Sequence, residues 1–294
     1  MEKMLRNKTA ILLFLAPAVL LYLCVVLYPI LLSISYSFFS WDLIHPRRFV
    51  GIQNFSRMFT RDDVFPVAVR NALFFMVTSL ALQTTVAYLL ALFLAERIRA
   101  RNFFKNVVFL PAVIPGIAVG LLGSLVYRPD IGLLNVLLRG VGLGGLARPW
   151  LLQQLPALWA VTLTLGWQYT GYATIVFVAG IQGIPPDIFE AALIDGAGAV
   201  RTARSITIPL TRQVLRVEVV LIAIGSLKIF DLIYVMTQGG PVHATEVLAT
   251  YIYTRAFFQF EYGYGDALSV MLLALCLLVT VLINRVLRAP DVQF

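Results

Sequence analysis

Residues 190–209 read EAALIDGAGAVRTARSITIP, a polar, Gly- and Ala-rich stretch between two apolar segments. Pro185 and Pro186 precede it and predict the end of the apolar segment before it, because proline cannot continue a helical hydrogen-bond ladder. Asp187 lies three residues before Glu190, which is the spacing of a capping box, and predicts the start of a short helix. Lipid accounts for most of the remaining sequence but not for this stretch, which indicates a surface that contacts another protein.

The second half of the stretch predicts another short helix. Gly196 is suited to the left-handed turn that ends the first helix. The second helix is expected over about 199–206, with Pro209 just past its end and with Arg201 and Arg204 on one face. Taken alone, the same features also fit an ordinary amphipathic linker.

The composition of the chain indicates a membrane protein. Of its 294 residues, 60% are hydrophobic and 13% are charged, with a net charge of +8. Soluble domains average about 45–50% apolar and about 25% charged residues. The arginines lie between apolar runs, where membrane topology and anionic lipid explain them better than nucleic acid does. We therefore expect no nucleic-acid partner.

Apolar runs of about 20 residues predict an all-α integral membrane protein with six transmembrane helices. The predicted spans are about 10–38, 72–95, 107–127, 156–181, 214–236 and 267–286. A signal peptide is the alternative for the first run, but that run is longer than a signal-peptide core and no A-x-A site follows it. The predicted organisation is a first helix with an outer loop at 1–69, a core at 70–288 with the loop at 183–212, and a tail at 289–294.

Basic residues in the short loops predict that both termini are cytoplasmic. The denser set of loops, which we place in the cytoplasm, carries Lys3, Arg6, Lys8, Arg97, Arg99, Arg101, Lys105, Arg201, Arg204, Arg212, Arg216, Arg285 and Arg288. The stretch at 190–209 then lies in the cytoplasm.

No metal, disulfide or nucleotide motif is apparent. Cys24 and Cys276 lie inside apolar runs, and His45 and His243 are far apart in the sequence. No G-x-x-x-x-G-K-[ST] sequence occurs. We expect no metal site, no cofactor and no catalytic residue in this chain.

Polar and aromatic residues inside the spans are the candidates for binding a solute, because polar groups at membrane depth line cavities or pair with each other. Trp167, Gln168, Tyr169 and Tyr172 lie near the middle of the fourth predicted span, where helix packing or interfacial anchoring is the alternative for the aromatics. Lys228, Asp231 and Tyr234 follow at three-residue spacing on the fifth, which predicts one shared face.

Simpler roles are possible for the polar residues of the fifth and second spans. Asp231 is taken as the only carboxylate well inside a span, and a structural ion pair with Lys228 is its alternative role. Asn71 and Gln83 are weaker binding candidates, since hydrogen bonds between helices also explain them.

The stretch at 190–209 resembles the EAA loop of permeases of ATP-binding-cassette (ABC) importers, with the pattern E-A-A, three residues, G, nine residues, I, one residue, L, P. Ile208 stands in place of the usual Leu, and Val200 and Ala203 stand where relatives often carry aromatics. The pattern and its family-like neighbours fall on Glu190, Ala191, Ala192, Asp195, Gly196, Ala197, Ile206 and Pro209.

The rest of the chain is similar to carbohydrate-type permeases, of the maltose-F, lactose-F and glycerol-phosphate-A kind. The similar segments are 49–55, Asn71, Gly132, Asn135, 149–151, and 230–231 followed by 237–241, which reads TQGGP. The resemblance implies a type I ABC importer permease that moves a sugar or oligosaccharide across the inner membrane of a prokaryote.

The same resemblance implies the partners. They are a second permease, two ATPase subunits that bind ATP and Mg²⁺, and an extracytoplasmic binding protein, and the EAA loop couples the permease to the ATPase. Alternatives are the same machinery importing glycerol phosphate or another small polar solute, and an ion-coupled secondary transporter, for which inverted repeats are expected but not apparent. A membrane scaffold without transport does not explain the EAA loop.

Overall fold

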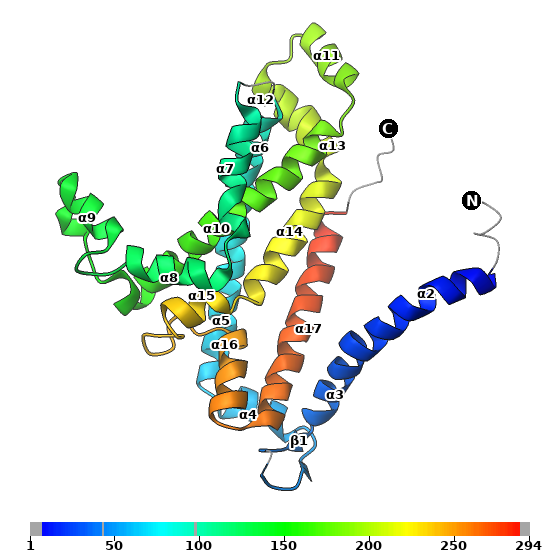
Figure 1. The fold of residues 1–294 in the computed structure, drawn as a ribbon, viewed down its shortest axis with the longest axis vertical. Helices are drawn as coiled ribbons and strands as arrows, with labels where there is room; N and C mark the ends of the chain where they lie inside the picture. Colours follow the sequence, from blue (N-terminus) through cyan, green and yellow to red (C-terminus); the bar gives the residue numbers. More distant parts are fainter. Residues whose placement is uncertain (1–7, 43, 97–98, 289–294) are drawn as a thin grey trace. The chain divides into compact units, whose positions relative to one another are not determined.

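The computed structural model describes residues 8–42, 44–96 and 99–288, with the side chains of 8–10 left out. Its backbone is predominantly helical, and the described part holds one small sheet, in which β1 (Phe39–Ser40) pairs antiparallel with β2 (Arg48–Phe49). The described chain divides into two compact units, one of residues up to 62 with 252–273, the other of residues 63–251 with 274 onward. Figure 1 shows the elements of each unit.

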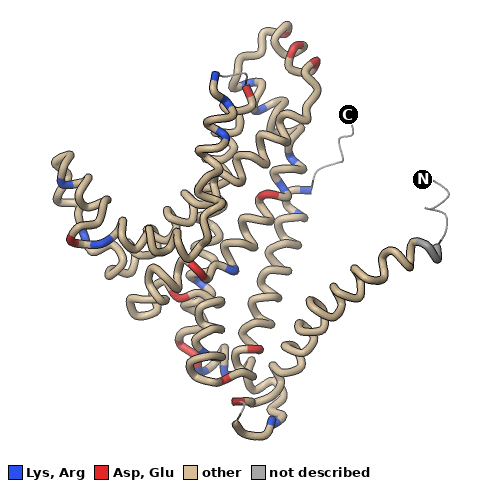
Figure 2. The backbone as a smooth tube through the Cα atoms, viewed as in Figure 1, with Lys and Arg blue, Asp and Glu red and all other residues tan. Residues whose placement is uncertain are grey.

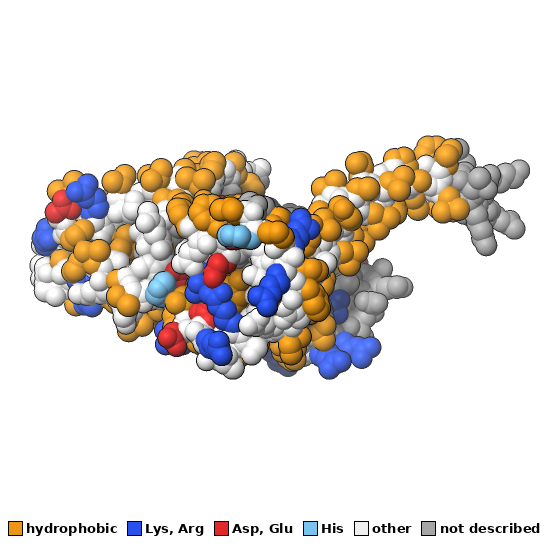
Figure 3. Space-filling view, turned by 90° about the horizontal axis from the view of Figure 1, so that it is seen from below, with side chains coloured by type: hydrophobic (Ala, Val, Ile, Leu, Met, Phe, Trp, Pro, Cys, Tyr) orange, Lys and Arg blue, Asp and Glu red, His pale blue; other side chains and the backbone are white. Residues whose placement is uncertain are grey.

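The first unit begins with a long apolar helix. α2 (Lys8–Tyr22) continues through a π-helical turn (Leu23–Leu27) into α3 (Tyr28–Tyr36). Most of its described side chains are exposed, Leu13 by 74% and Phe14 by 75%, and Figure 3 shows this helix covered with hydrophobic side chains. Such a surface requires lipid or another apolar partner around it.

Polar contacts hold the remainder of the first unit together. α4 (Gln53–Thr60) carries Asn54, whose amide donates to the carbonyls of Ser37 and Phe39 at 2.8 and 3.0 Å. Arg57 on the same helix pairs with Glu261 at 2.8 Å. The asparagine and the arginine therefore fix α4 to the chain at the first strand of the hairpin and to the segment before α17 (Tyr262–Val286).

The second unit contains a helical bundle. α5 (Val64–Ser79) runs through a π-helical turn (Leu80–Thr84) into α6 (Thr85–Ala95), and α10 (Gln154–Gln182) packs against α6 and α7 (Arg101–Val113). The core between them includes Tyr88 and Phe177, whose ring centroids are 5.1 Å apart, with Ile222 from α14 (Arg212–Leu227). α10 has no charged residue in its 29 residues, and in Figure 2 the charges of α17 lie near its two ends.

The number of membrane spans agrees with the sequence prediction. Four stretches are long and apolar enough to cross a membrane, and two further bent helix pairs bring the number to six. The four are Ile11–Tyr36, Val64–Ala95, Arg212–Met236 and Tyr262–Val286. The bent pairs are α7 with α8 (Gly116–Val126) and α10 with α11 (Pro186–Ile194).

The second and third predicted spans illustrate how the structure differs in detail. The second begins at Val64 rather than at 72. The third, predicted as one run over 107–127, is two helices that meet at 94°. Ile114 between them is extended, with φ −73° and ψ 131°, as expected for a residue that precedes a proline.

Shorter elements complete the second unit. α9 (Leu133–Gly140) lies between two chain segments that Asn135 joins, since its amide donates to the carbonyls of Pro129 and Arg148 at 3.2 and 3.0 Å. α15 (Asp231–Met236) packs against α8, and α16 (Leu248–Tyr253) follows the loop at 237–247 and continues as a π-helical turn (Thr254–Phe258).

Candidate functional site

The second unit contains a cavity of about 430 Å³, lined by residues of six helical elements. Gln83 reaches it from the π-helical turn before α6, and Gly116 from the start of α8. α10 contributes Leu165 and three polar side chains, and the chain from α14 to the start of α15 supplies the opposite wall. The volume lies in the range of about 300–1,000 Å³ that is typical of small-molecule sites.

Five of the predicted binding residues line this cavity together. They are Gln168, Tyr169, Tyr172, Lys228 and Asp231. Trp167 and Tyr234 are not among its lining residues. Trp167 is 52% exposed, whereas the ring of Tyr234 stacks on that of Phe230, 5.2 Å away, and Phe230 does line the cavity.

Lys228, Asp231 and Tyr234 do not share one helical face. α14 ends at Leu227 and α15 begins at Asp231, so that the helix breaks between the lysine and the aspartate. Within the described residues these two side chains form no ion pair, which makes the predicted structural pairing wrong. The Asp231 carboxylate instead lies against the start of α8, where a Cβ on Gly116 would be 3.0 Å from Oδ2.

Glu218 is the residue that sequence reasoning missed. It lines the cavity from α14 and is 1% exposed, so Asp231 is not the only carboxylate inside a span. Its Oε2 has no hydrogen-bond partner among the described residues. The signal was present in the sequence, because Glu218 lies between Val217 and Val219 inside the fifth predicted span.

Gln168 has a similar free acceptor. It is also 1% exposed, and its Nε2 donates to the carbonyl of Ile114 at 3.1 Å. Its Oε1 lacks a partner in the described part of the chain. The bend between α7 and α8 exposes the Ile114 carbonyl and thereby sets the orientation of this amide.

The stretch at 190–209 forms a bent helical connection. α11 ends near Gly196, which has φ +72° as expected, and α12 (Ala199–Thr202) follows. Leu193, Ile194 and Val200 are exposed by 77, 85 and 68%, whereas Ala192 is buried. An apolar surface on an otherwise polar loop indicates a protein contact.

Two details of that loop were predicted wrongly. Pro185, not Asp187, occupies the N-cap of α11, no side chain caps the helix, and Asp187 lies in its first turn. The second helix does not end before Pro209. It continues through a π-helical turn (Ala203–Thr207) into α13 (Ile208–Leu210), so that Pro209 lies inside a continuous helical run, two residues after the π-helical turn.

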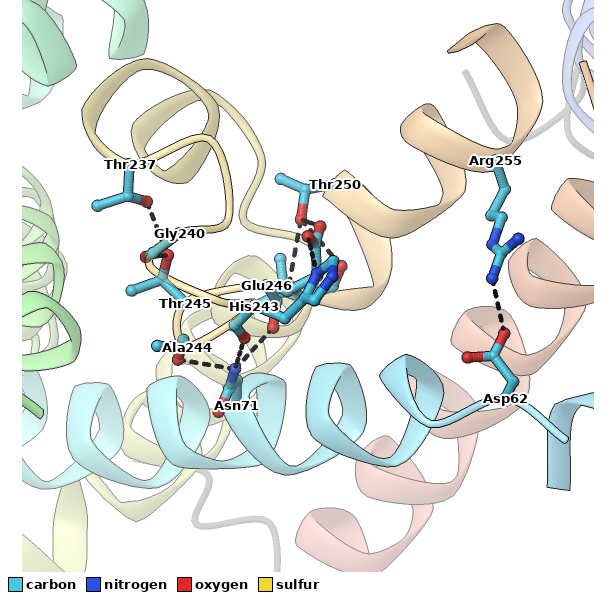
Figure 4. A network of polar contacts seen from close by, with 11 residues as sticks. Asp62, Asn71, Thr237, Gly240, His243, Ala244, Thr245, Glu246, Thr250 and Arg255 are labelled. Atoms are coloured by element: carbon cyan, nitrogen blue, oxygen red, sulfur yellow. Dashed lines mark hydrogen bonds and ion pairs between the residues drawn. The ribbon is translucent and has the colours of Figure 1, made fainter. Parts of the chain in front are cut away.

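The loop at 237–250 is a closed polar network (Figure 4). Asn71 donates from Nδ2 to the carbonyls of His243, Ala244 and Glu246 at 3.2, 2.9 and 2.9 Å. The buried carboxylate of Glu246 accepts from Thr250 Oγ1 at 2.6 Å and lies 3.1 Å from His243 Nδ1. The hydrogen-bonding role considered for Asn71 is therefore present, while Gln83 lies at the cavity.

The threonine of the TQGGP segment belongs to the same loop. Thr245, which follows the segment, donates from Oγ1 to the carbonyl of Gly240 at 2.8 Å and lies 2.7 Å from Thr237 Oγ1. The segment thus serves as the turn that the sequence indicated, and its threonine hydroxyl lies against Thr245 rather than lining the cavity.

Comparison with known proteins gives one consistent result. Residues 83–290 match the model of a family described as binding-protein-dependent transport system inner membrane component. The chain is 36% identical over 275 residues to the "Probable ABC transporter permease protein YurN" of Bacillus subtilis strain 168, covering 92% of this chain and 94% of the relative.

Two further relatives have names that include a solute. The trehalose/maltose transport system permease protein MalF of Thermococcus litoralis is 34% identical over 276 residues, with 90% of each chain covered. The diacetylchitobiose uptake system permease protein NgcF of Streptomyces coelicolor is 34% identical over 292 residues, covering 95% of this chain and 82% of the relative.

Among solved structures, a chain of a bacterial ABC transporter involved in the import of the acidic polysaccharide alginate has the same fold. The TM-score is 0.82 at 23% identity, with 98% of this chain and 97% of that chain covered. A second structure of a bacterial alginate ABC transporter, in complex with an alginate pentasaccharide-bound periplasmic protein, also gives 0.82, at 22% identity and 99% coverage of both chains.

Proposed function

This chain belongs to the family of binding-protein-dependent transport system inner membrane components, and we propose that it conducts a sugar through its cavity as the permease of an ATP-driven importer. As a member of that family it is a multi-pass inner membrane protein. The observation that carries the proposal is the convergence of Gln168, Tyr169, Tyr172, Lys228 and Asp231 on one cavity.

The chemistry of the cavity suits a saccharide. Tyrosine rings offer flat apolar faces to the C–H side of a sugar ring, while amide and carboxylate groups bond its hydroxyls. A small number of polar groups on a largely apolar wall is the usual arrangement of a small-molecule site. Relatives named for trehalose/maltose and for diacetylchitobiose support a carbohydrate as the solute.

Energy for transport comes, in this proposal, from separate subunits. The sequence contains no phosphate-binding G-x-x-x-x-G-K-[ST] motif. We place ATP and Mg²⁺ in two ATPase partners, and the exposed apolar residues of the loop at 190–209 are the surface on which an ATPase docks. A second permease and an extracytoplasmic binding protein complete the complex, in which both termini of this chain are cytoplasmic.

Uptake by the reconstituted complex tests the role of the cavity. Gln168→Ala and Tyr172→Ala should each lower binding-protein-dependent sugar uptake about tenfold or more, because each removes a group that contacts the solute. Trp167→Ala is the matched control, since Trp167 is adjacent in sequence but does not line the cavity. Unchanged uptake in both cavity variants, with the complex intact, would contradict the proposal.

A pair of glycine variants tests the coupling loop. Gly196 has φ +72°, which valine adopts only with strain, whereas Gly198 has φ −73° and ψ 165°, a conformation that valine favours. A side chain would meet no atom within 4 Å at either position. Gly196→Val should therefore separate ATP hydrolysis from uptake or release the ATPase, and Gly198→Val should do neither; equal coupling in both variants would refute the role of this turn.

A further inference from the structure

The wall of the cavity contains two buried oxygens that accept no hydrogen bond within the described residues. They are Oε1 of Gln168 and Oε2 of Glu218, on α10 and α14. Both side chains are 1% exposed. An unsatisfied buried acceptor costs about 1–3 kcal/mol, and more when it is charged, so these two oxygens require donors.

The donor for Glu218 cannot come from the lysine of the same cavity wall. Lys228 lies ten residues after Glu218, just past the end of α14, which corresponds to a rise of about 15 Å along the helix axis at about 1.5 Å per residue. No ion pair of Glu218 exists in the described part of the chain. The cavity therefore has one end with a carboxylate and no cation, and another where Lys228 and Asp231 lie.

The balance of charge in the lining is acidic. Glu218 and Asp231 are its carboxylates and Lys228 is its one basic residue. In a poorly solvated site, a carboxylate of the solute would face at least one like charge, and like charges held close together disfavour binding. Hydroxyl and ammonium groups, in contrast, supply the hydrogen bonds that Gln168 and Glu218 lack.

We propose that Glu218 forms an acceptor subsite that binds hydroxyl or ammonium donors, with Gln168 as a second acceptor at a different level of the cavity, so that the cavity selects neutral and amino sugars over uronic acids and sugar phosphates. This inference rests on the proposed function and specifies its substrate class. The structural neighbour named for the import of an acidic polysaccharide has the same fold. Side chains such as Glu218, rather than the architecture, then determine the charge of the accepted sugar.

Three probes of similar size and different charge test the subsite. Glucose, glucosamine and glucuronate are titrated separately into the purified complex of permeases and ATPases, and the apparent Kd of each is taken from the rise in Tm. We expect glucosamine to bind most tightly, glucose less tightly and glucuronate most weakly. Glucuronate binding as tightly as glucosamine, or no stabilisation by any probe, would overturn the inference.

Substitutions assign the effect to the two residues. Glu218→Gln should weaken the binding of glucosamine about tenfold or more and weaken the binding of glucose less, because the charge is lost while one acceptor remains. The difference in affinity between glucosamine and glucuronate should therefore become smaller. Gln168→Met should weaken the binding of glucose and of glucosamine by similar factors. Asp266→Asn is the control, since that carboxylate lies on α17 and bonds Ser33 at 2.6 Å, and it should keep the order of the wild type.

The outcome separates this inference from the proposed function. If Glu218→Gln keeps the order of the three probes while Gln168→Ala and Tyr172→Ala abolish uptake, the subsite is wrong and the transport role stands. If those alanine variants leave uptake intact, the transport role itself fails.

Discussion

Two regions of the second unit each bury one amide and one carboxylate side chain, but the hydrogen bonding of these groups differs between the regions. In the loop at 237–250, Asn71 makes three hydrogen bonds and Glu246 has partners for both oxygens. In the cavity, Gln168 and Glu218 each keep an oxygen that accepts nothing from the described residues. A buried amide and a buried carboxylate are thus structural in one place and available to a ligand in the other.

The difference has a physical origin in where the hydrogen-bond partners lie. The loop folds back on itself, so that backbone carbonyls, threonine hydroxyls and a histidine surround the two side chains within hydrogen-bond distance. The cavity is bounded by long apolar helices, whose backbone groups bond one another. The loop therefore stabilises the fold and the cavity retains capacity to bind. Three pairs of substitutions test this contrast.

The largest effect is expected from Gly239→Ala in the closed loop. Gly239 has φ +81°, and a Cβ there would collide with the Glu246 carboxylate. We expect a loss of about 3–4 kcal/mol, from about 1–2 kcal/mol of backbone strain together with disruption of a buried network. The measurement is the Tm of the purified complex without ligand.

Gly142→Ala is the control for that variant. Gly142 has the same φ of +81°, but a Cβ there would meet nothing within 4 Å. It should lose only the strain of about 1–2 kcal/mol. Equal shifts in Tm for the two alanine variants would show that the packing of Glu246 against Gly239 contributes nothing.

Asn71→Leu and Gln168→Leu compare the two buried amides directly. Removing the Asn71 amide leaves three loop carbonyls without their donor and should cost about 2–3 kcal/mol. Removing the Gln168 amide breaks one bond to Ile114 but also eliminates an unsatisfied oxygen, so stability should change by less than about 1 kcal/mol while uptake falls. Thermal unfolding and uptake are measured on both, and a larger loss of stability for Gln168→Leu would remove the distinction.

The sequence predicted much of this contrast from local patterns. The length of the apolar runs predicted the spans, since a helix that crosses lipid requires about 20 apolar residues. Polar and aromatic side chains inside those runs identified five of the residues that line the cavity. Gly196 and the turn at 237–241 were readable because glycine has a specific conformational role at a left-handed position.

Other features depended on contacts that no local pattern contains. Asn71 is separated by more than 170 residues from the carbonyls it bonds, and nothing in its own span indicates them. The break between Leu227 and Asp231 carries neither proline nor glycine, so spacing alone predicted one continuous face. Pro209 was placed after a helix because proline usually ends one, yet it lies within a continuous helical run here, two residues after a π-helical turn.

The smallest and most diagnostic effect is expected from one substitution made at two positions. Glu246→Gln replaces a carboxylate that accepts from Thr250 and lies beside His243, and should lower stability by about 1–2 kcal/mol. Glu218→Gln removes a carboxylate whose Oε2 has no partner in the described chain, and should leave the Tm unchanged or raise it, because burying an unpaired charge is unfavourable. The changes in stability at the two positions differ in sign because of their hydrogen-bond partners and not because of burial, as both side chains are more than nine-tenths buried. A loss at Glu218 as large as that at Glu246 would mean that Glu218 is satisfied within the protein, and the acceptor subsite would then have no free oxygen on α14 to offer.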